Sequence, residues 1–189
     1  AETTAAFEPA PCKFEGVKAS WAKKNRVECG WLNVRESRDK PDSRKLKLWV
    51  AIARADGADR REDPILYIQG GPGVATVDYF FPYFPKSKTW PGFRKARDMV
   101  FFDQRGTGRS QPAFCPELNA TLAQVQQEAP PAREALDRSK AAYAACRQKM
   151  LAQGMDFTAF NSTVTVEDAE DLRRALGIAR WNVYGISYG

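Results

Sequence analysis

The sequence has 189 residues, of which 43% are hydrophobic and 28% charged, as expected for a globular protein with a core of its own. The net charge is +6, but basic and acidic residues are interspersed without a basic aromatic stripe, so we expect no nucleic-acid partner. No apolar run approaches the roughly 20 residues that cross a bilayer, so we expect no membrane span.

The counts of histidine and cysteine restrict the chemistry further. The chain has no histidine, so it cannot supply the base of a serine–histidine–acid triad, and it lacks the usual ligands of a zinc or haem site. We therefore expect no metal. The four cysteines, Cys12, Cys29, Cys115 and Cys146, form no CxxC pair. Their even number and wide spacing favour two disulfides in an oxidising compartment, and four buried thiols are the alternative.

The first residues of the chain are compatible with those of an exported protein. These residues, Ala-Glu-Thr-Thr-Ala-Ala, lack the charged and apolar regions of a signal peptide and fit the mature end of a processed protein. We expect a secreted or periplasmic location. Residues 1–28 contain two prolines and no periodic pattern, which predicts an irregular segment.

The next residues predict a pair of antiparallel strands. Apolar and polar residues alternate over 30–34 and, more loosely, over 46–52. The polar stretch 36–45 between them contains Pro41 and is typical of a connecting loop.

Three further runs predict strands of a different kind. Residues 65–68 and 99–102 are short and continuously apolar, as in strands buried on both faces of a parallel sheet. A third run, 181–186, is also expected to be buried and leads directly into Ser187.

Helical composition fills the region between the second and third of these runs. Residues 121–153 are rich in alanine and interrupted at Pro130-Pro131, which predicts a helix over about 132–153. A second helix is expected to begin near Thr165, with Asp168 at the spacing of a capping box, and to stop at Gly177. The apolar stripe predicted to pack in the core comprises Val166, Ala169, Leu172, Ala175 and Leu176. The alternation of strands and helices predicts an α/β fold with a mostly parallel sheet and an N-terminal antiparallel hairpin.

The first motif with chemical meaning is Gly185-Ile186-Ser187-Tyr188-Gly189. A G-x-S-x-G sequence after a strand is typical of the sharp turn that exposes a nucleophilic serine, and its glycines leave room for that turn. Ser187 is therefore the candidate nucleophile.

Two glycine-rich segments follow the other buried strands. Residues 69–73, Gln-Gly-Gly-Pro-Gly, can bring backbone N–H groups close to a substrate, and a plain turn is the alternative. Residues 103–110, Asp-Gln-Arg-Gly-Thr-Gly-Arg-Ser, place Asp103 and Arg105 where they can tie neighbouring loops together. Asp103 is a poor candidate for a triad acid, because in α/β-hydrolases the acid follows the serine.

Together these motifs resemble the prolyl and tripeptidyl aminopeptidase group of α/β-hydrolases. The similar segments are 29–34, 68–73, 103–110, 168–177 and 181–189, and the resemblance covers roughly 11–189. It implies an α/β-hydrolase fold, incomplete in this chain, and a cofactor-free serine exopeptidase that acts on peptides with a free N-terminus, often next to proline or small hydrophobic residues.

The resemblance also implies roles for single residues. Ser187 is the nucleophile, Gly71 and Tyr188 donate to the oxyanion, and Gly70, Asp103 and Arg105 support the site structurally. Cys115 and Cys146 correspond to a disulfide that flanks a helical insertion at about 115–160. Gln69 stands where cytosolic prolyl iminopeptidases carry histidine, so the chain is more similar to the secreted tripeptidyl branch.

Residues 29–189 then correspond to the N-terminal half of the hydrolase core. We expect the lid, the later strands, the triad acid and the histidine from a C-terminal portion of the same enzyme, without which this chain is inactive. Two alternatives stay open. The same fold also serves carboxylesterases and amidases, and a chain without histidine is also compatible with a catalytically inactive fragment.

Overall fold

The computed structural model describes residues 5–189, apart from the side chain of Pro85. Its strands are β1 (Ala6–Ala10), β2 (Val27–Arg35), β3 (Lys45–Ala53), β4 (Ile65–Ile68), β5 (Met99–Phe102) and β6 (Asn182–Gly185). Its α-helices are α1 (Ala19–Lys24), α2 (Thr76–Phe80), α3 (Trp90–Arg94), α4 (Pro116–Glu128), α5 (Ala132–Ala152) and α6 (Ser162–Ala175), with 3-10 turns at Phe84–Lys86 and Phe157–Ala159. The chain forms two compact units, Ala1–Pro112 with Ala159–Gly189, and Ala113–Thr158.

The first unit contains an open six-stranded sheet with the order β1-β2-β3-β5-β4-β6. β1, β2, β3 and β5 pair antiparallel in succession, whereas β4 is parallel to both β5 and β6. The protein is therefore α/β, but the prediction of a mostly parallel sheet is wrong for the described residues. The sheet is mixed because β3 joins the parallel strands in an antiparallel sense and a further strand, β1, lies outside the hairpin.

The N-terminal part of the sheet is more regular than its sequence indicates. The predicted hairpin is present as β2 and β3, paired over nine residues each. Residues 1–28, expected to be irregular, include β1 and α1, whereas residues 1–4 lie outside the described part. β1 escapes sequence analysis because it is a short edge strand that contains Pro9, and proline is tolerated in a strand at an edge.

The apolar runs differ in burial. β5 is buried at every position and β4 at its two central residues, Leu66 and Tyr67, which confirms the prediction for these strands. β6 was also expected to be buried, but each of its four residues is exposed. β6 pairs with β4 on one side only, so in the described chain it is an edge strand.

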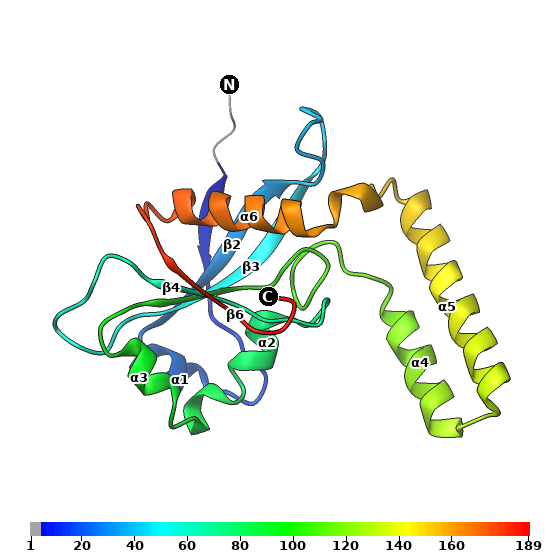
Figure 1. Ribbon diagram of the computed structural model, residues 1–189, viewed down its shortest axis with the longest axis horizontal. Coiled ribbons are helices and arrows are strands. Elements are labelled where there is room, and N and C mark those ends of the chain that lie inside the picture. Colours follow the sequence, from blue (N-terminus) through cyan, green and yellow to red (C-terminus); the bar gives the residue numbers. More distant parts are fainter. Residues whose placement is uncertain (1–4) are drawn as a thin grey trace. The chain divides into compact units, whose positions relative to one another are not determined.

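Helices cover both faces of this sheet (Figure 1). On one face, side chains from α1, α2 and α3 pack with Trp49, Tyr67 and Phe101. On the other face, Ala169 and Leu172 of α6 pack against Leu66, Val100 and other strand residues. The connection from β4 to β5 therefore runs over one face of the sheet, and the connection from β5 to β6 returns over the other face. β4 lies between β5 and β6, at the switch point of the sheet. In open α/β sheets, ligands bind outside the carboxyl ends of strands at such a point.

α6 begins three residues earlier than predicted. Asn161 caps the helix, and its side-chain oxygen accepts a hydrogen bond from Val164 N at 3.0 Å. Thr165 and Asp168 do not form the expected capping box, because Asp168 is turned into the interior. Val166, predicted to lie in the core, is 68% exposed, and within the predicted stripe it is Ala169 and Leu172 that are buried against the sheet.

The second unit is a pair of helices, α4 and α5, with a break at residues 130–131 as the two prolines predict. The disulfide Cys115–Cys146 joins the start of α4 to the C-terminal half of α5. Glu128 also forms an ion pair with Arg138 at 2.6 Å. This unit is therefore closed by a covalent bond at one end and an ion pair near its turn.

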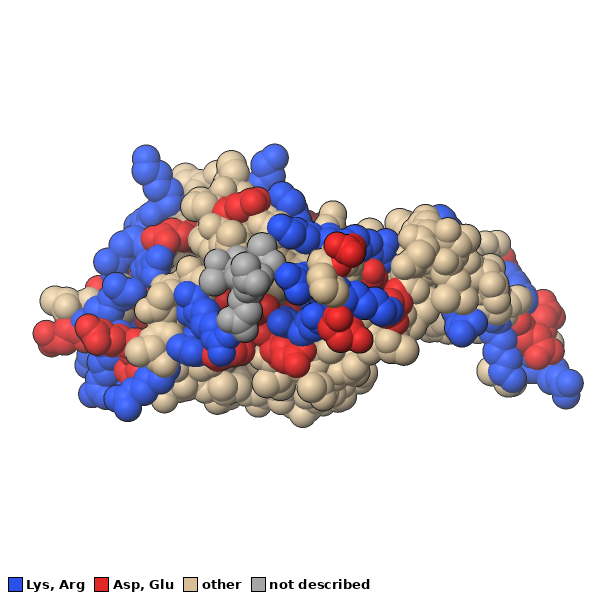
Figure 2. Space-filling model, turned by 90° about the horizontal axis from the view of Figure 1, so that it is seen from above, with Lys and Arg blue, Asp and Glu red and all other residues tan. Residues whose placement is uncertain are grey.

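The surface charges are mixed in sign. In Figure 2, lysine and arginine side chains alternate with aspartate and glutamate over the visible face. Within residues 5–189, no helix combines the length and apolar character needed to cross a bilayer.

Candidate active site

The candidate nucleophile lies in a strained turn at the carboxyl end of β6. Ser187 has φ +59°, in the left-handed region that residues with a side chain rarely adopt and that costs about 1–2 kcal/mol. The turn is closed by a hydrogen bond from Gly189 N to Ile186 O at 3.0 Å. Ser187 itself is exposed. We call residues 186–189 the Ser187 turn.

Steric limits require glycine at both ends of the G-x-S-x-G motif. A Cβ atom on Gly185 would overlap Gly189 O, and one on Gly189 would overlap Ile68 O. Both ends of the motif therefore pass too close to other backbone atoms to carry a side chain. The G-x-S-x-G spacing thus has a physical reason: the positions two residues before and two residues after Ser187 have no space for a side chain.

The loop after β4 lies directly against this turn. A Cβ atom on Gly70 would be 2.7 Å from Ser187 Cβ and 2.8 Å from Tyr188 N, so a side chain at this position is excluded. Residues 70–75, which we call the glycine loop, thus meet the Ser187 turn at the carboxyl ends of two adjacent parallel strands. The structure brings together the segments that carry Ser187, Tyr188 and Gly70.

The glycine loop is tightly folded. Gly71 and Gly73 have φ values of +129° and +99°, and the Gly71–Pro72 peptide bond is cis. A Cβ on Gly71 would lie 3.0 Å from both Gly73 N and Val74 N, so several backbone N–H groups gather within this short segment. Preorganised N–H groups next to a serine are the elements from which an oxyanion site is built.

A hydroxyl contact joins the Ser187 turn to α6. Tyr188 Oη and Ser162 Oγ are 2.6 Å apart, and Ser162 is the first residue of the helix. Gln69, which directly follows β4, accepts a hydrogen bond from Tyr67 Oη at 2.5 Å. The Ser162 contact has no signal in the sequence, because nothing in a single serine indicates a partner 26 residues away.

Asp103 lies at the carboxyl end of β5 and is completely buried. Its Oδ1 accepts a hydrogen bond from Val77 N at 2.7 Å, and its Oδ2 accepts one from Arg109 N at 3.2 Å. Burial raises the pKa of this carboxyl to about 7, against the opposing effect of the two N–H donors. One oxygen is thus bound to the backbone of α2 and the other to the backbone of the segment that follows β5.

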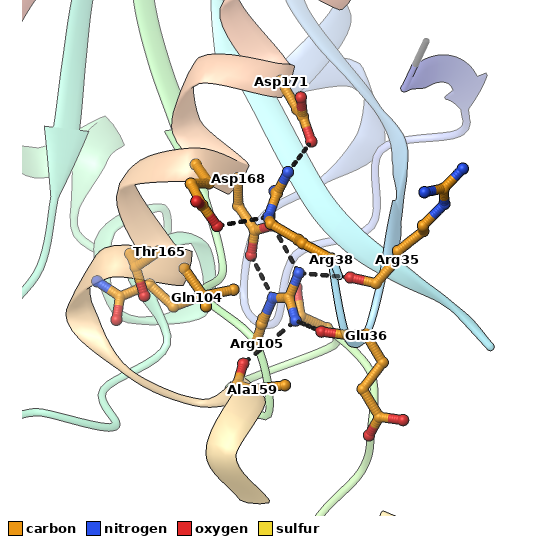
Figure 3. Close-up of polar contacts among 12 residues, drawn as sticks. Arg35, Glu36, Arg38, Gln104, Arg105, Ala159, Thr165, Asp168 and Asp171 are labelled. Carbon is orange, nitrogen blue, oxygen red and sulfur yellow. Dashed lines mark hydrogen bonds and ion pairs between the residues drawn. The ribbon is translucent and has the colours of Figure 1, made fainter. Parts of the chain in front are cut away.

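Arg105 is the centre of a buried polar network between α6 and the end of β2 (Figure 3). Its Nε and Nη2 contact the two carboxylate oxygens of Asp168 at 2.5 and 2.8 Å. The remaining guanidinium N–H groups bond to the carbonyl oxygens of Arg35, Glu36 and Ala159. A bidentate pair of this kind combines charge attraction with fixed geometry. Arg105 therefore holds α6 to the end of β2.

Arg38 adds a second guanidinium to the same carboxylate. It contacts Asp168 at 2.6 Å, Asp171 at 2.8 Å and Glu167 at 2.9 Å. Asp168 is thereby held between two arginines. Its pKa is nevertheless raised, because burial raises it more than Arg105 and Arg38 lower it. No local sequence pattern indicates the role of Arg38, because its partners lie about 130 residues away in the chain.

The cysteines form two disulfides, Cys12–Cys29 and Cys115–Cys146. The alternative of four free thiols is therefore excluded, and the pairing implied for Cys115 and Cys146 is present. Among residues 5–189, no group of three or more histidine, cysteine, aspartate or glutamate side chains is arranged to hold a metal ion.

Comparison with known proteins gives relatives but no match to a family model. The chain is 28% identical over 182 residues to the tripeptidyl aminopeptidases of Streptomyces coelicolor and Streptomyces lividans, covering 93% of this chain and 33% of each relative. YuaR of Escherichia coli (strain K12), whose name proposes hydrolase activity without a substrate, is 27% identical over 99 residues, 48% of this chain and 19% of its own length. The chain thus spans about a third of the tripeptidyl aminopeptidases that it matches, and the similarity supports a hydrolase, with peptidases among its relatives.

Proposed function

We propose that this chain is the nucleophile-bearing part of a serine exopeptidase with the α/β-hydrolase fold. The observation that carries the proposal is the strained backbone of Ser187, with φ +59°, packed against Gly70 at the carboxyl ends of adjacent strands. Strain of this size persists in a fold when the surroundings enforce it, and it concentrates at functional sites.

In the proposed reaction, Ser187 Oγ attacks the carbonyl carbon of a peptide bond. The negative charge that develops on the carbonyl oxygen is stabilised by the N–H groups of Gly71 and Tyr188. The C–N bond breaks as the base returns the hydroxyl proton to the leaving amine, and water then hydrolyses the acyl-enzyme on Ser187. These steps need no cofactor, but they need a base to take the hydroxyl proton and an acid to orient that base.

A histidine base cannot come from this chain, since it has no histidine. We place the triad acid, the histidine and the lid in a C-terminal portion of the same enzyme, and we expect residues 1–189 by themselves to be inactive. The relatives are about three times as long as their matched segment, which leaves room for these parts.

The proposed substrate is a peptide with a free N-terminus, from which one residue or a short peptide is released. The name tripeptidyl aminopeptidase, carried by two relatives, supports this class. Two disulfides support a secreted or periplasmic location, because they persist in oxidising compartments.

The substrate class is tested with the natural full-length polypeptide and its Ser187→Ala variant. We expect hydrolysis of tripeptidyl p-nitroanilides with a free N-terminus, and little hydrolysis of the same compounds when the N-terminus is acetylated. Turnover of p-nitrophenyl esters without turnover of either anilide would favour an esterase. Equal turnover by the Ser187→Ala variant would exclude Ser187 as the nucleophile.

A further inference from the structure

The buried carboxylate of Asp103 is attached to the segment that follows the glycine loop. Val77, whose N–H donates to Asp103 Oδ1 at 2.7 Å, is the second residue of α2, and α2 begins immediately after the loop ends at Ala75. The bond therefore fixes the C-terminal end of the loop to the carboxyl end of β5.

The other carboxylate oxygen is fixed as well. Oδ2 accepts from Arg109 N at 3.2 Å, and a Cβ on Gly108 would overlap Oδ2 and lie 2.8 Å from Ala75 Cβ. Gly108, the carboxylate and the end of the glycine loop are thus in direct contact. The backbone of Asp103 is itself held, because Ser110 Oγ donates to Asp103 O at 2.6 Å.

The opposite end of the loop meets the candidate nucleophile. Gly70 follows β4 and lies against Ser187 and Tyr188, with no space for a side chain. A chain of contacts therefore runs from Asp103 through Val77 and the loop to Gly70 and Ser187. The loop that joins these two ends has only six residues, so the connection from Val77 to Gly70 is short.

We propose that Asp103 is a positioning residue for acyl transfer, which holds the glycine loop in register with Ser187 through the N–H of Val77. This inference rests on the proposed function of Ser187. Asp103 does not touch the substrate. It sets where the loop N–H groups lie relative to the developing oxyanion, and errors of about 1 Å in such a position can lower a rate on the order of a hundredfold.

Asp98 provides a matched control on the same strand. It directly precedes β5, whereas Asp103 directly follows it, and Asp98 is also buried and accepts a backbone N–H bond, from Ala55 at 2.8 Å. Asp98 lies at the amino end of β5, away from the glycine loop. Asp98→Asn and Asp103→Asn therefore make the same carboxyl-to-amide change at opposite ends of one strand, and Asp98 is in addition paired with Arg54 and Arg60.

The test uses tripeptidyl p-nitroanilide turnover by the full-length enzyme, at a temperature where circular dichroism shows each variant folded. We expect Asp103→Asn to lower kcat about 10-fold or more with KM within about 3-fold of wild type, because an amide has one acceptor oxygen for the two N–H donors of Val77 and Arg109, and the displaced loop loses transition-state stabilisation. Asp98→Asn is expected to keep kcat within about 2-fold. Equal losses of kcat in both variants, or an unchanged kcat in Asp103→Asn, would overturn the proposal.

A second pair of variants covers the case in which Asp103→Asn does not fold. Gly108→Ala pushes on the carboxylate without removing it, and Gly16→Ala has a similar positive φ, +68° against +51°, with nothing within 4 Å of the new Cβ. We expect only Gly108→Ala to lower kcat, and equal kcat values in the two variants would contradict the proposal. Absence of Ser187-dependent turnover in the wild-type enzyme would instead reject the proposed function, so the two failures are distinguishable.

Discussion

Gly70 and Ser187 lie so close together that a side chain on Gly70 would place its Cβ 2.7 Å from Ser187 Cβ. The two residues follow β4 and β6, which are parallel neighbours in the sheet. Their contact joins two segments that are more than a hundred residues apart in the sequence. It is the geometric basis for regarding the loop and the serine as one site.

The first prediction concerns this contact. Gly70→Ala forces the loop and the Ser187 turn apart, so we expect kcat of the full-length enzyme to fall about 10- to 100-fold. The control is Gly92→Ala in α3, where a Cβ meets nothing within 4 Å. Anilide turnover and circular dichroism of both variants check the prediction. An unchanged kcat in Gly70→Ala would show that the contact between Gly70 and Ser187 does not affect catalysis.

The second prediction concerns the Arg105–Asp168 pair. Asp168→Asn leaves Arg105 buried, at 7% exposure, without its carboxylate, and breaking such a pair costs about 3–5 kcal/mol of unfolding free energy. Urea unfolding followed by tryptophan fluorescence measures the loss. Arg174→Ala is the control, since it removes an exposed ion pair with Glu170 and is expected to leave the midpoint nearly unchanged. Equal midpoints for the two variants would mean that the buried pair does not stabilise the fold.

The third prediction follows from the raised pKa of Asp103, about 7 against an ordinary value of 3.8. Between these values the folded protein keeps a proton that the unfolded chain releases, so this group's contribution to stability is present at low pH and is lost as pH rises toward 7. Asp78 and Arg109 are the charged groups that face it, with opposite effects on its pKa. Since other groups also titrate, the relevant quantity is the difference between wild type and Asp103→Asn.

That difference is measured by unfolding both proteins at a series of pH values from 4 to 8. We expect the wild type to lose unfolding free energy relative to Asp103→Asn as pH rises through this range, by a few kcal/mol at most. A constant difference would show that Asp103 titrates in the folded state as it does in the unfolded chain.

The fourth prediction concerns the helical unit. The Cys115–Cys146 disulfide closes a segment with a sequence separation of 31, and removal of such a bond costs about 3–4 kcal/mol in the chain-entropy model. Replacing both cysteines by serine is expected to speed proteolysis within residues 113–158. Intact mass before and after reduction checks that both disulfides exist in the wild type; an unchanged cleavage rate in the variant would contradict the prediction.

Much of the central sheet could be predicted from the sequence. β4 and β5 were recognised because strands buried on both faces need uninterrupted apolar residues, and the predicted hairpin corresponds to β2 and β3. β1 was missed because proline and a single neighbouring strand leave no alternating pattern. The burial of β6 was overestimated, since an apolar sequence does not reveal whether a strand has one neighbour or two.

The polar interior was less predictable. In the sequence, Asp168 is explained as a carboxylate near the start of a helix, where it favours the helix dipole. That interpretation gives no reason to expect a buried ion pair. Arg105 is 63 residues away and Arg38 is 130 residues away, so only the folded chain brings them together. Glycine and serine spacing, by contrast, predicted the Ser187 turn and the glycine loop because backbone geometry is local.

The most direct test of the central claim is covalent labelling of Ser187 by a fluorophosphonate probe, with peptide mass spectrometry to locate the adduct. In the natural full-length polypeptide we expect labelling at Ser187, abolished in Ser187→Ala, whereas residues 1–189 alone should react far more slowly because they contain no histidine. Labelling of the isolated segment at the full-length rate, or an adduct elsewhere in the full-length protein, would contradict the account.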